Sequence, residues 1–217
     1  MDKVLKTLKL IENQVKKFNV PYLKDIFHKK DPFRILVSCI LSTRTKDAIT
    51  ERATKRLFEV ADTPFKIAKL SLRHLQNLIY PVGFYHNKAK ILLDLNKKII
   101  KDFKGKVPAS KEDLLKLKRV GEKCANLVLG LGFKIPSICV DTHVHRISSR
   151  LGWVETKTSF ATAKDLKKII PQKYWIKLNT LLVAFGQNIC KPISPLCSKC
   201  KVDKNNLCPK NQVVFRR

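Results

Sequence analysis

The amino-acid sequence predicts an all-α protein of about ten helices connected by short loops. Apolar residues recur at intervals near 3.6 residues through almost the whole chain of 217 residues, which is the period of an amphipathic helix. The strand-like segment 137–140 is too short and isolated to indicate a sheet. A composition of 44% hydrophobic and 29% charged residues is that of a globular protein. A chain of this length can bury a core without disulfide bonds.

Four helices are predicted before residue 86. The first presents a single apolar face, formed by Val4, Leu5, Leu8, Ile11, Val15 and Phe18. An apolar helix follows over 33–40, and another helix covers 47–60. Thr63-Pro64 begins a further helix, because a threonine cap followed by proline is a typical helix start.

Six further helices are predicted after residue 86. Ser110 is expected to cap the helix that follows it, since Asp113 stands three residues later. The other five cover residues 87–103, 122–131, 142–151, 159–170 and 173–186. After Gly186, prolines and four cysteines end the helical pattern, and this tail is interpreted as a loop held together by a metal.

The charge is strongly unbalanced, with 45 Lys+Arg, 17 Asp+Glu and a net charge of +28. Such an excess repels itself unless the partner is a polyanion, so nucleic acid is favoured ahead of an anionic membrane surface. No apolar run reaches the ~18 residues of a spanning helix. The N-terminus lacks the apolar core of a secretory signal, so we expect a reducing compartment. Neither G-x-x-x-x-G-K-[ST] nor G-x-G-x-x-G is present, which argues against a nucleotide cofactor.

Four of the seven cysteines crowd together near the C-terminus: Cys190, Cys197, Cys200 and Cys208. Their spacing, with a C-x2-C pair and intervening prolines, predicts one tetrathiolate site. From the spacing alone, structural zinc is favoured over an iron–sulfur cluster. The remaining cysteines, Cys39, Cys124 and Cys139, lie in apolar stretches and are interpreted as small buried hydrophobic residues.

Two predicted helices meet at the tight turn Arg119-Val120-Gly121, and the second begins at Glu122. Such a hairpin directs free backbone N–H groups and the positive end of a helix dipole toward whatever lies before the second helix. In a protein with a charge of +28, we expect that object to be a DNA phosphate. The turn taken alone, however, favours an ordinary helical hairpin.

Lys123 and Asp141 form the candidate catalytic pair. Lys123 lies on the first turn of the second helix, where the dipole is expected to lower the pKa of its amine. Asp141 stands where the cap of the helix over 142–151 is expected, so its carboxylate should stay ionised. An amine shifted toward neutrality beside a persistent carboxylate suits nucleophilic attack through a Schiff base. From spacing alone, the simpler interpretation is a solvated lysine and a helix cap.

Several segments together resemble the endonuclease III family, part of the helix–hairpin–helix, Gly/Pro…Asp DNA glycosylase superfamily. They are 117–126, 140–146 and the four clustered cysteines, and 41–47 and 82–89 look like two more segments of the family. The match runs in order from about Pro32 to Cys208, which is most of the chain.

The resemblance implies a two-domain helical DNA glycosylase fold with the DNA cleft between the domains. A six-helix barrel that contains the helix–hairpin–helix would cover 24–135, and 1–23 with 136–217 would form an iron–sulfur cluster domain. The resemblance also implies that the four clustered cysteines bind a [4Fe-4S] cluster, which reverses the preference for zinc. It implies Lys123 as the nucleophile and Asp141 as its electrostatic and proton-handling partner.

Seven residues are candidate DNA contacts: Arg44, Phe84, Arg119, Val120, Gly121, His143 and Lys191. Arg44 and Phe84 match positions where the family inserts side chains to hold a base outside the duplex. The chain departs from the family pattern in three places. Lys118 and Arg119 replace Pro and Gly in the hairpin, so a distorted hairpin is expected, because a non-glycine residue tolerates positive φ poorly. Arg44 stands where glutamine is common, and the last cysteine spacing is x7 instead of x5.

The sequence therefore predicts a bifunctional DNA glycosylase/AP lyase that excises oxidised pyrimidines and nicks the strand by β-elimination in base excision repair. Its expected partner is duplex DNA with damaged pyrimidines or abasic sites. We expect a monomer without membrane attachment, associated with the nucleoid in the cytoplasm of a prokaryote. One alternative is a mismatch-specific adenine or thymine glycosylase of the same superfamily, which commonly carries Tyr or Ser where Lys123 stands. The other is a non-catalytic DNA-binding module with structural zinc.

Overall fold

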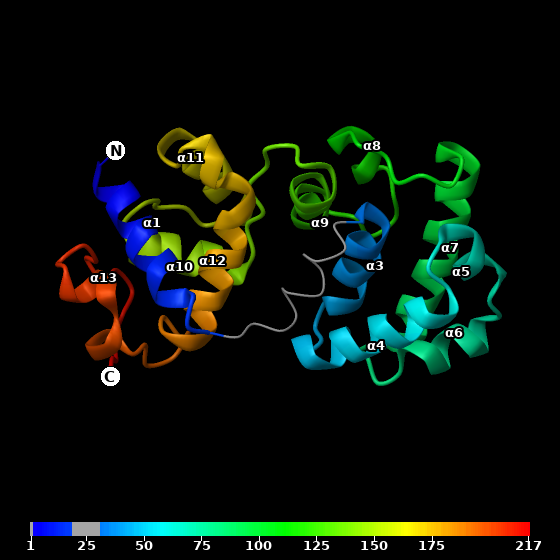
Figure 1. Cartoon of the computed structure of the whole chain (residues 1–217), viewed down its shortest axis with the longest axis horizontal. Coiled ribbons are helices and arrows are strands. Elements are labelled where there is room, and N and C mark those ends of the chain that lie inside the picture. Colours follow the sequence, from blue (N-terminus) through cyan, green and yellow to red (C-terminus); the bar gives the residue numbers. More distant parts are fainter. Residues whose placement is uncertain (1, 19–30) are drawn as a thin grey trace. The chain divides into compact units, whose positions relative to one another are not determined.

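The structure, a computed structural model, describes residues 2–18 and 31–217, and over these residues it is helical without any strand, as the apolar periodicity predicts (Figure 1). The α-helices are, in chain order, α1 (Asp2–Val15), α3 (Pro32–Ser42), α4 (Asp47–Val60), α5 (Pro64–Lys69), α6 (Leu72–Ile79), α7 (Tyr85–Phe103), α8 (Lys111–Leu115), α9 (Glu122–Leu127), α10 (Thr142–Arg150), α11 (Ser159–Ile169), α12 (Trp175–Asn188) and α13 (Lys201–Lys204). Turns of 3₁₀ helix cover Gln172–Tyr174 and Cys197–Lys199, and a π-helical turn covers Val128–Gly132. None of the described helices is long and apolar enough to cross a membrane.

The described residues fall into two compact units. One contains the described part of Met1–Val20 together with Pro136–Arg217, and we call it the C-terminal unit. The other contains the described part of Pro21–Ile135, and we call it the hairpin unit. The predicted boundary between residues 23 and 24 lies outside the described residues. The assignment of a six-helix barrel and a cluster domain to these segments stays a prediction.

Short polar side chains determine where several of these helices begin. Thr63 accepts a backbone hydrogen bond at 3.2 Å, with Pro64 at the first position of α5, as predicted. Ser110 Oγ accepts from the N–H of Asp113 at 3.1 Å and donates to its carboxylate at 2.7 Å, so the predicted cap forms. Ser71 caps α6 in the same way, and this helix is absent from the sequence prediction.

Two predicted elements differ from the structure. The helix expected over 122–131 is α-helical only as far as Leu127 and then continues as the π-helical turn. This turn packs closely on the start of α3, where a Cβ added to Gly132 would lie 2.9 Å from Cα of Pro32. The tail after Gly186 is predicted as a loop held together by a metal. In the structure it also contains short helical turns, over Cys197–Lys199 and Lys201–Lys204.

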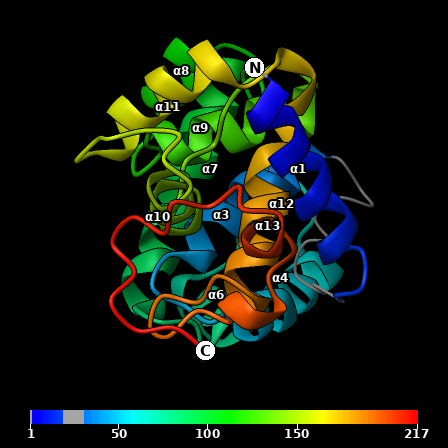
Figure 2. The ribbon, with the colours of Figure 1, turned by 90° about the vertical axis from the view of Figure 1, so that its left-hand side faces the viewer.

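Helix α1 packs onto the C-terminal unit with its predicted apolar face. Leu8 and Ile11 are fully buried and Val15 is almost so. They share one core with residues of α10 and α12 such as Ile147 and Leu182, and Figure 2 shows α1 lying along α12 and α13. Burying each such side chain contributes about 1.5–3 kcal/mol. The two ends of the chain therefore stabilise each other.

Candidate active site and cysteine pocket

The chain between α8 and α9 forms the predicted tight turn. Leu117 and Val120 point into the hairpin unit, where they are almost completely buried, and the Val120 N–H donates to the Leu117 carbonyl at 3.1 Å. Arg119 has a φ of 67°, in the left-handed region. The hairpin therefore closes in spite of the non-glycine residue, and the expected distortion is confined to the strained backbone of Arg119.

Arg119→Gly is expected to raise the free energy of unfolding by up to about 1 kcal/mol. Glycine adopts positive φ without a Cβ clash, although it also gains freedom in the unfolded chain. Lys118→Gly is the matched control, because Lys118 has no positive φ and glycine there should lower stability by roughly 0.5–1 kcal/mol. Chemical denaturation measures both changes, and equal losses of stability would contradict the prediction.

A pocket open to solvent lies beside this turn, with about 430 Å³ of empty space when the solvent in its mouth is included. Its lining comes from the turn, from the start of α9 and from the end of α3, namely Cys39, Ile40, Thr43, Arg119, Gly121, Lys123 and Cys124. The Lys123 side chain is exposed, so its amine can reach a ligand in the pocket. The lining contributes the cations of Lys123 and Arg119 and no carboxylate, which favours an anionic ligand. A Cβ added to Gly121 would meet no atom within 4 Å, so the backbone there is open to that ligand.

The three cysteines outside the C-terminal group are buried, as predicted. Cys39, Cys124 and Cys139 are between 4% and 8% exposed. A hydrogen bond with Cys124 lowers the pKa of the Cys39 thiol, burial opposes this change, and the charge of Lys123 adds to it. Cys39 and Cys124 therefore join α3 to α9 at the base of the turn that carries Lys123.

Asp141 caps α10, as its position in the sequence predicts. Its Oδ1 accepts from the Val144 N–H at 2.9 Å, and its side chain is half-buried. His143 lies against α12, where a Cβ added to Gly186 would come within 2.5 Å of the imidazole Nδ1. Asp141 and His143 belong to the C-terminal unit, whereas Lys123 belongs to the hairpin unit.

Arg44 and Phe84 lie together on the surface of the hairpin unit. The guanidinium carbon of Arg44 is 5.7 Å from the centroid of the Phe84 ring, within cation–π range. Both side chains are exposed, Phe84 by 63%. Both residues also have a left-handed backbone, with φ values of 52° and 59°. A cation and an apolar ring thus project together from two loops that are distant in the sequence.

Lys88 on α7 is a polar residue that sequence reasoning does not find. It is only 5% exposed, and its Nζ donates to the carbonyls of Leu41 at 2.8 Å and Thr43 at 2.5 Å and to the hydroxyl of Thr45 at 3.0 Å. Burial lowers the pKa of Lys88 to about 8. Its spacing of four residues from Leu92, which places it on the buried face of α7, is the signal that could have found it.

All four clustered cysteines line one pocket of the C-terminal unit, together with Arg150 and Asp203. Burial raises the pKa of Cys200 to about 11 and also raises those of Cys197 and Cys208. Binding a metal needs thiolates and would therefore release protons. Within residues 2–18 and 31–217, no group of three or more His, Cys, Asp or Glu is arranged so that it could hold a metal ion. The argument for a metal is therefore the chemistry of the ligands: four thiols that line one pocket are typical of zinc and iron–sulfur sites.

The segment from Cys190 to Cys208 is called the cysteine segment, and two arginines of α10 hold its start. Arg150, which is 6% exposed, donates to the carbonyls of Lys191 and Pro192, both at 2.7 Å, and its Nη1 lies 3.5 Å from the Cys190 sulfur. Arg146 donates to the Cys190 carbonyl at 2.9 Å. Because a guanidinium presents its donors in a rigid plane, these bonds fix the backbone on both sides of Cys190.

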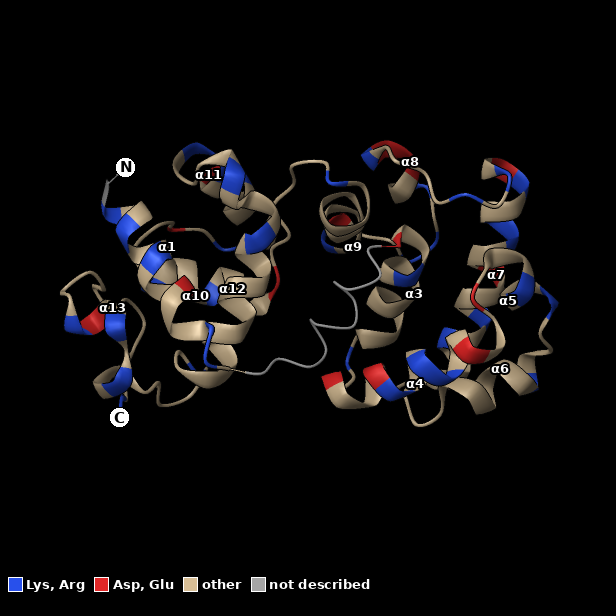
Figure 3. Ribbon diagram, viewed as in Figure 1, with Lys and Arg blue, Asp and Glu red and all other residues tan. Residues whose placement is uncertain are grey.

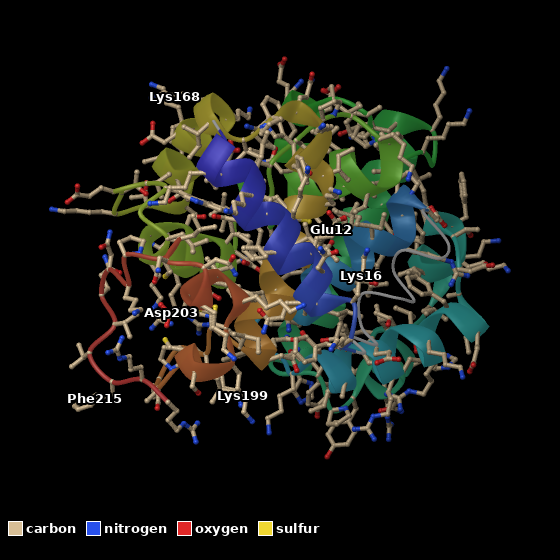
Figure 4. All side chains as sticks on the ribbon, turned by 60° about the vertical axis from the view of Figure 1, so that its left-hand side comes forward. Glu12, Lys16, Lys168, Lys199, Asp203 and Phe215 are labelled. Atoms are coloured by element: carbon tan, nitrogen blue, oxygen red, sulfur yellow. The ribbon has the colours of Figure 1, made fainter. Side chains whose placement is uncertain are left out.

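Gln14 on α1 holds the C-x2-C part of the same segment. Its amide nitrogen donates to the Lys199 carbonyl at 2.7 Å, and its amide oxygen accepts from the Lys201 N–H at 3.0 Å. These two residues flank Cys200, and Figure 4 shows Lys199 and Asp203 on the segment beside α1. The lysines with exposed side chains here are Lys199, Lys201 and Lys204. The segment therefore combines a fixed backbone with a basic surface.

Comparisons with known proteins agree on one family. Residues 37–172 match the family model described as HhH-GPD superfamily base excision DNA repair protein. Endonuclease III of Thermotoga maritima is 49% identical over 174 residues, which cover 80% of this chain and 82% of that protein. Endonuclease III of Bacillus subtilis is 40% identical over 171 residues, 78% of each protein. A solved structure of a trapped endonuclease III–DNA covalent intermediate is 32% identical with a TM-score of 0.85, covering 96% of this chain and 95% of that one.

Proposed function

Because the chain belongs to the HhH-GPD superfamily of base excision DNA repair proteins and, within it, to the endonuclease III family, we propose that it excises oxidised pyrimidines from duplex DNA. It is a DNA glycosylase and abasic-site lyase, like the endonuclease III enzymes that it resembles in sequence and structure. A net charge of +28 supports a polyanionic partner, and Figure 3 shows Lys and Arg on helices of both units. We further propose that it acts as a monomer at the nucleoid, in the cytoplasm of a prokaryote.

The exposed Lys123 amine, in a pocket whose charged lining residues are both cations, carries this proposal. The damaged nucleotide must first leave the stack, because its C1′ is inaccessible inside a duplex. Lys123 Nζ then attacks C1′, the bond from C1′ to the base breaks, and the base leaves with a proton. The sugar ring opens to an imine between Lys123 and C1′. Loss of a C2′ proton expels the 3′ phosphate by β-elimination, and water finally releases the lysine.

The residues around Lys123 are proposed to hold a phosphate of the same strand. Arg119 supplies a guanidinium, and the open backbone at Gly121 supplies N–H groups at the start of α9. Val120 can take part only through its backbone, because its side chain is buried. Asp141 is proposed to stabilise the positive charge that develops on the sugar as the base departs. Its capping bond to α10 would hold the carboxylate in place for this task.

Arg44 and Phe84 are proposed to enter the duplex and fill the space that the extruded base leaves, whereas His143 and Lys191 are proposed to contact the DNA backbone. His143 is half-buried against α12, on the first turn of the helix that Asp141 caps. Lys191 is half-buried, and its backbone position is set by the bond from Arg150. Phosphate contacts of this kind add affinity and fix orientation without reading the base sequence.

We also propose that the four clustered cysteines hold a [4Fe-4S] cluster, as the family resemblance implies. A bound cluster would cross-link the end of α12 to the C-terminal tail through four iron–thiolate bonds. Arg146, Arg150 and Gln14 already fix the backbone beside the ligands, so the chain prepares the segment for binding. The exposed lysines of this segment would then meet phosphates on a rigid surface.

Cys197→Ser is expected to remove the cluster, lower the Tm and weaken duplex binding by about tenfold or more, because metal binding is linked to folding of the segment and to its phosphate contacts. Iron and sulfide analysis, thermal unfolding and fluorescence anisotropy measure the three effects. Cys139→Ala is the matched control, since Cys139 is buried in the same unit but does not line the pocket. A cluster-free Cys197→Ser protein with full duplex affinity would rule out the scaffold role.

Borohydride trapping tests the enzymatic proposal, because reduction of the imine leaves the protein covalently attached to DNA. Four duplexes are compared: one with an oxidised pyrimidine, one with an abasic site, one with an adenine or thymine mismatch, and one undamaged. Trapping is expected on the first two and absent from the others. Excision confined to the mismatch would instead indicate a mismatch glycosylase. Binding without excision on any duplex would indicate a DNA-binding module.

A further inference from the structure

Two loops of the hairpin unit meet through their backbones. The loop after α3 carries Arg44, and the turn before α7 carries Phe84. The Gly83 N–H donates to the Thr45 hydroxyl at 3.1 Å. A Cβ added to Gly83 would lie 2.6 Å from the Arg44 carbonyl oxygen, a distance that backbone atoms cannot accommodate. Only glycine therefore allows the two loops to approach this closely.

Lys88 holds the first of these loops from inside the unit. Its three acceptors are the carbonyls of Leu41 and Thr43 and the hydroxyl of Thr45, which is the same hydroxyl that binds Gly83. An ammonium group has three N–H donors, so each donor meets one acceptor. With a pKa lowered to about 8 by burial, the group still carries its proton at neutral pH. One buried cation thus joins the first turn of α7 to the residues on both sides of Arg44.

The strain in the two loops explains why such a link is needed. Arg44 and Phe84 both have left-handed backbones, which cost free energy in a non-glycine residue and persist only where the surroundings hold them. A buried charge is itself expensive, and an apolar side chain would fill the same volume at lower cost. Packing alone therefore gives no reason for a lysine on this face of α7, whereas fixing two strained loops does.

We infer that Lys88 is a positioning residue for base extrusion: its ammonium group fixes the loop of Arg44 against the turn of Phe84, so that both side chains enter the duplex with one defined geometry. Lys88 does not touch DNA itself and acts through these two residues. The inference depends on the proposed function, in which Arg44 and Phe84 fill the space that the extruded base leaves.

Lys88→Met removes the three bonds and keeps an unbranched side chain. Two reactions of the full-length, cluster-loaded protein are compared: excision of an oxidised pyrimidine from duplex DNA, and cleavage at an abasic site in single-stranded DNA, where no base has to leave a stack. Because charge-assisted hydrogen bonds are lost, kcat/KM on the duplex should fall about tenfold or more, and cleavage of the single strand should stay within about twofold. Thr45→Val removes one acceptor and the bond to Gly83, and it should give a weaker effect with the same selectivity for duplex.

A double-mutant comparison separates positioning from general stability. In protein with Arg44 and Phe84 both replaced by alanine, Lys88→Met should change duplex excision by less than about twofold, because the side chains that it positions are gone. The inference would be overturned if Lys88→Met slowed the duplex and the single-strand reactions equally. It would also be overturned if Lys88→Met lowered duplex excision about tenfold in the protein that carries the two alanines. If the alanine protein itself kept normal duplex excision, the inference would fail as well. Trapping through Lys123 would in that case still support the proposed enzyme.

Discussion

Lys123→Gln protein is expected to lose strand cleavage and borohydride trapping completely while it still binds duplex DNA. Glutamine keeps much of the length and polarity of the side chain but has no nucleophilic amine, so no imine can form. Duplex affinity should change little, because Lys123 is one of 45 basic residues. Gel assays of cleavage and trapping measure the first effect, and fluorescence anisotropy measures the second.

Lys118→Gln is the matched control for this experiment. Lys118 belongs to the same hairpin connection, and its side chain is exposed and pairs with Asp94 at 3.2 Å on the surface. The substitution removes the same charge but leaves the amine of Lys123 in place, so cleavage and trapping should be close to normal. Trapping of the Lys123→Gln protein at the normal rate would disprove the nucleophile assignment. Another amine, or attack by water, would then have to replace it.

Helix starts are the part of this fold that the sequence predicts best, because the rule for a cap involves residues only a few positions apart. Thr63, Ser110 and Asp141 all cap helices as expected. The π-helical turn after α9 is not predictable in this way. This turn packs against the start of α3, where Gly132 approaches Pro32 closely, and a contact between residues so far apart in the sequence cannot be read from a local pattern.

The same distinction applies to the candidate sites. Lys123 and the clustered cysteines stand out because their motifs are local. The candidate residues Arg119, Gly121 and Lys123, which are close in the sequence, line one pocket of the structure. Lys88 and Gln14 do not stand out, because their partners come from distant segments, α3 and the cysteine segment respectively. The spacing of four thiols also fits both zinc and an iron–sulfur cluster, so the donor set alone does not specify the metal.

Asp141→Asn is expected to slow excision of an oxidised pyrimidine by about 10²–10³ while the fold stays intact. Asparagine caps a helix about as well as aspartate, so the bond from the Val144 N–H should persist and the Tm should fall little. The amide, however, lacks the negative charge that would stabilise the sugar as the base departs. Cleavage at a preformed abasic site should be slowed less, because no base has to be expelled there.

Asp31→Asn separates this electrostatic effect from the loss of a charged cap. Asp31 also caps a helix, α3, and accepts from the Phe33 N–H at 2.9 Å, but it belongs to the hairpin unit and does not line the pocket of Lys123. Both substitutions weaken the interaction with a helix dipole by a similar amount, about 0.3–1 kcal/mol. Single-turnover rates on lesion and abasic duplexes should therefore change only in the Asp141 variant. One contrary result would be an equal loss of activity in both variants. Another would be that Asp141→Asn slows excision and abasic-site cleavage by the same factor. Either result would mean that Asp141 matters as a structural cap and not as the charge that assists departure of the base.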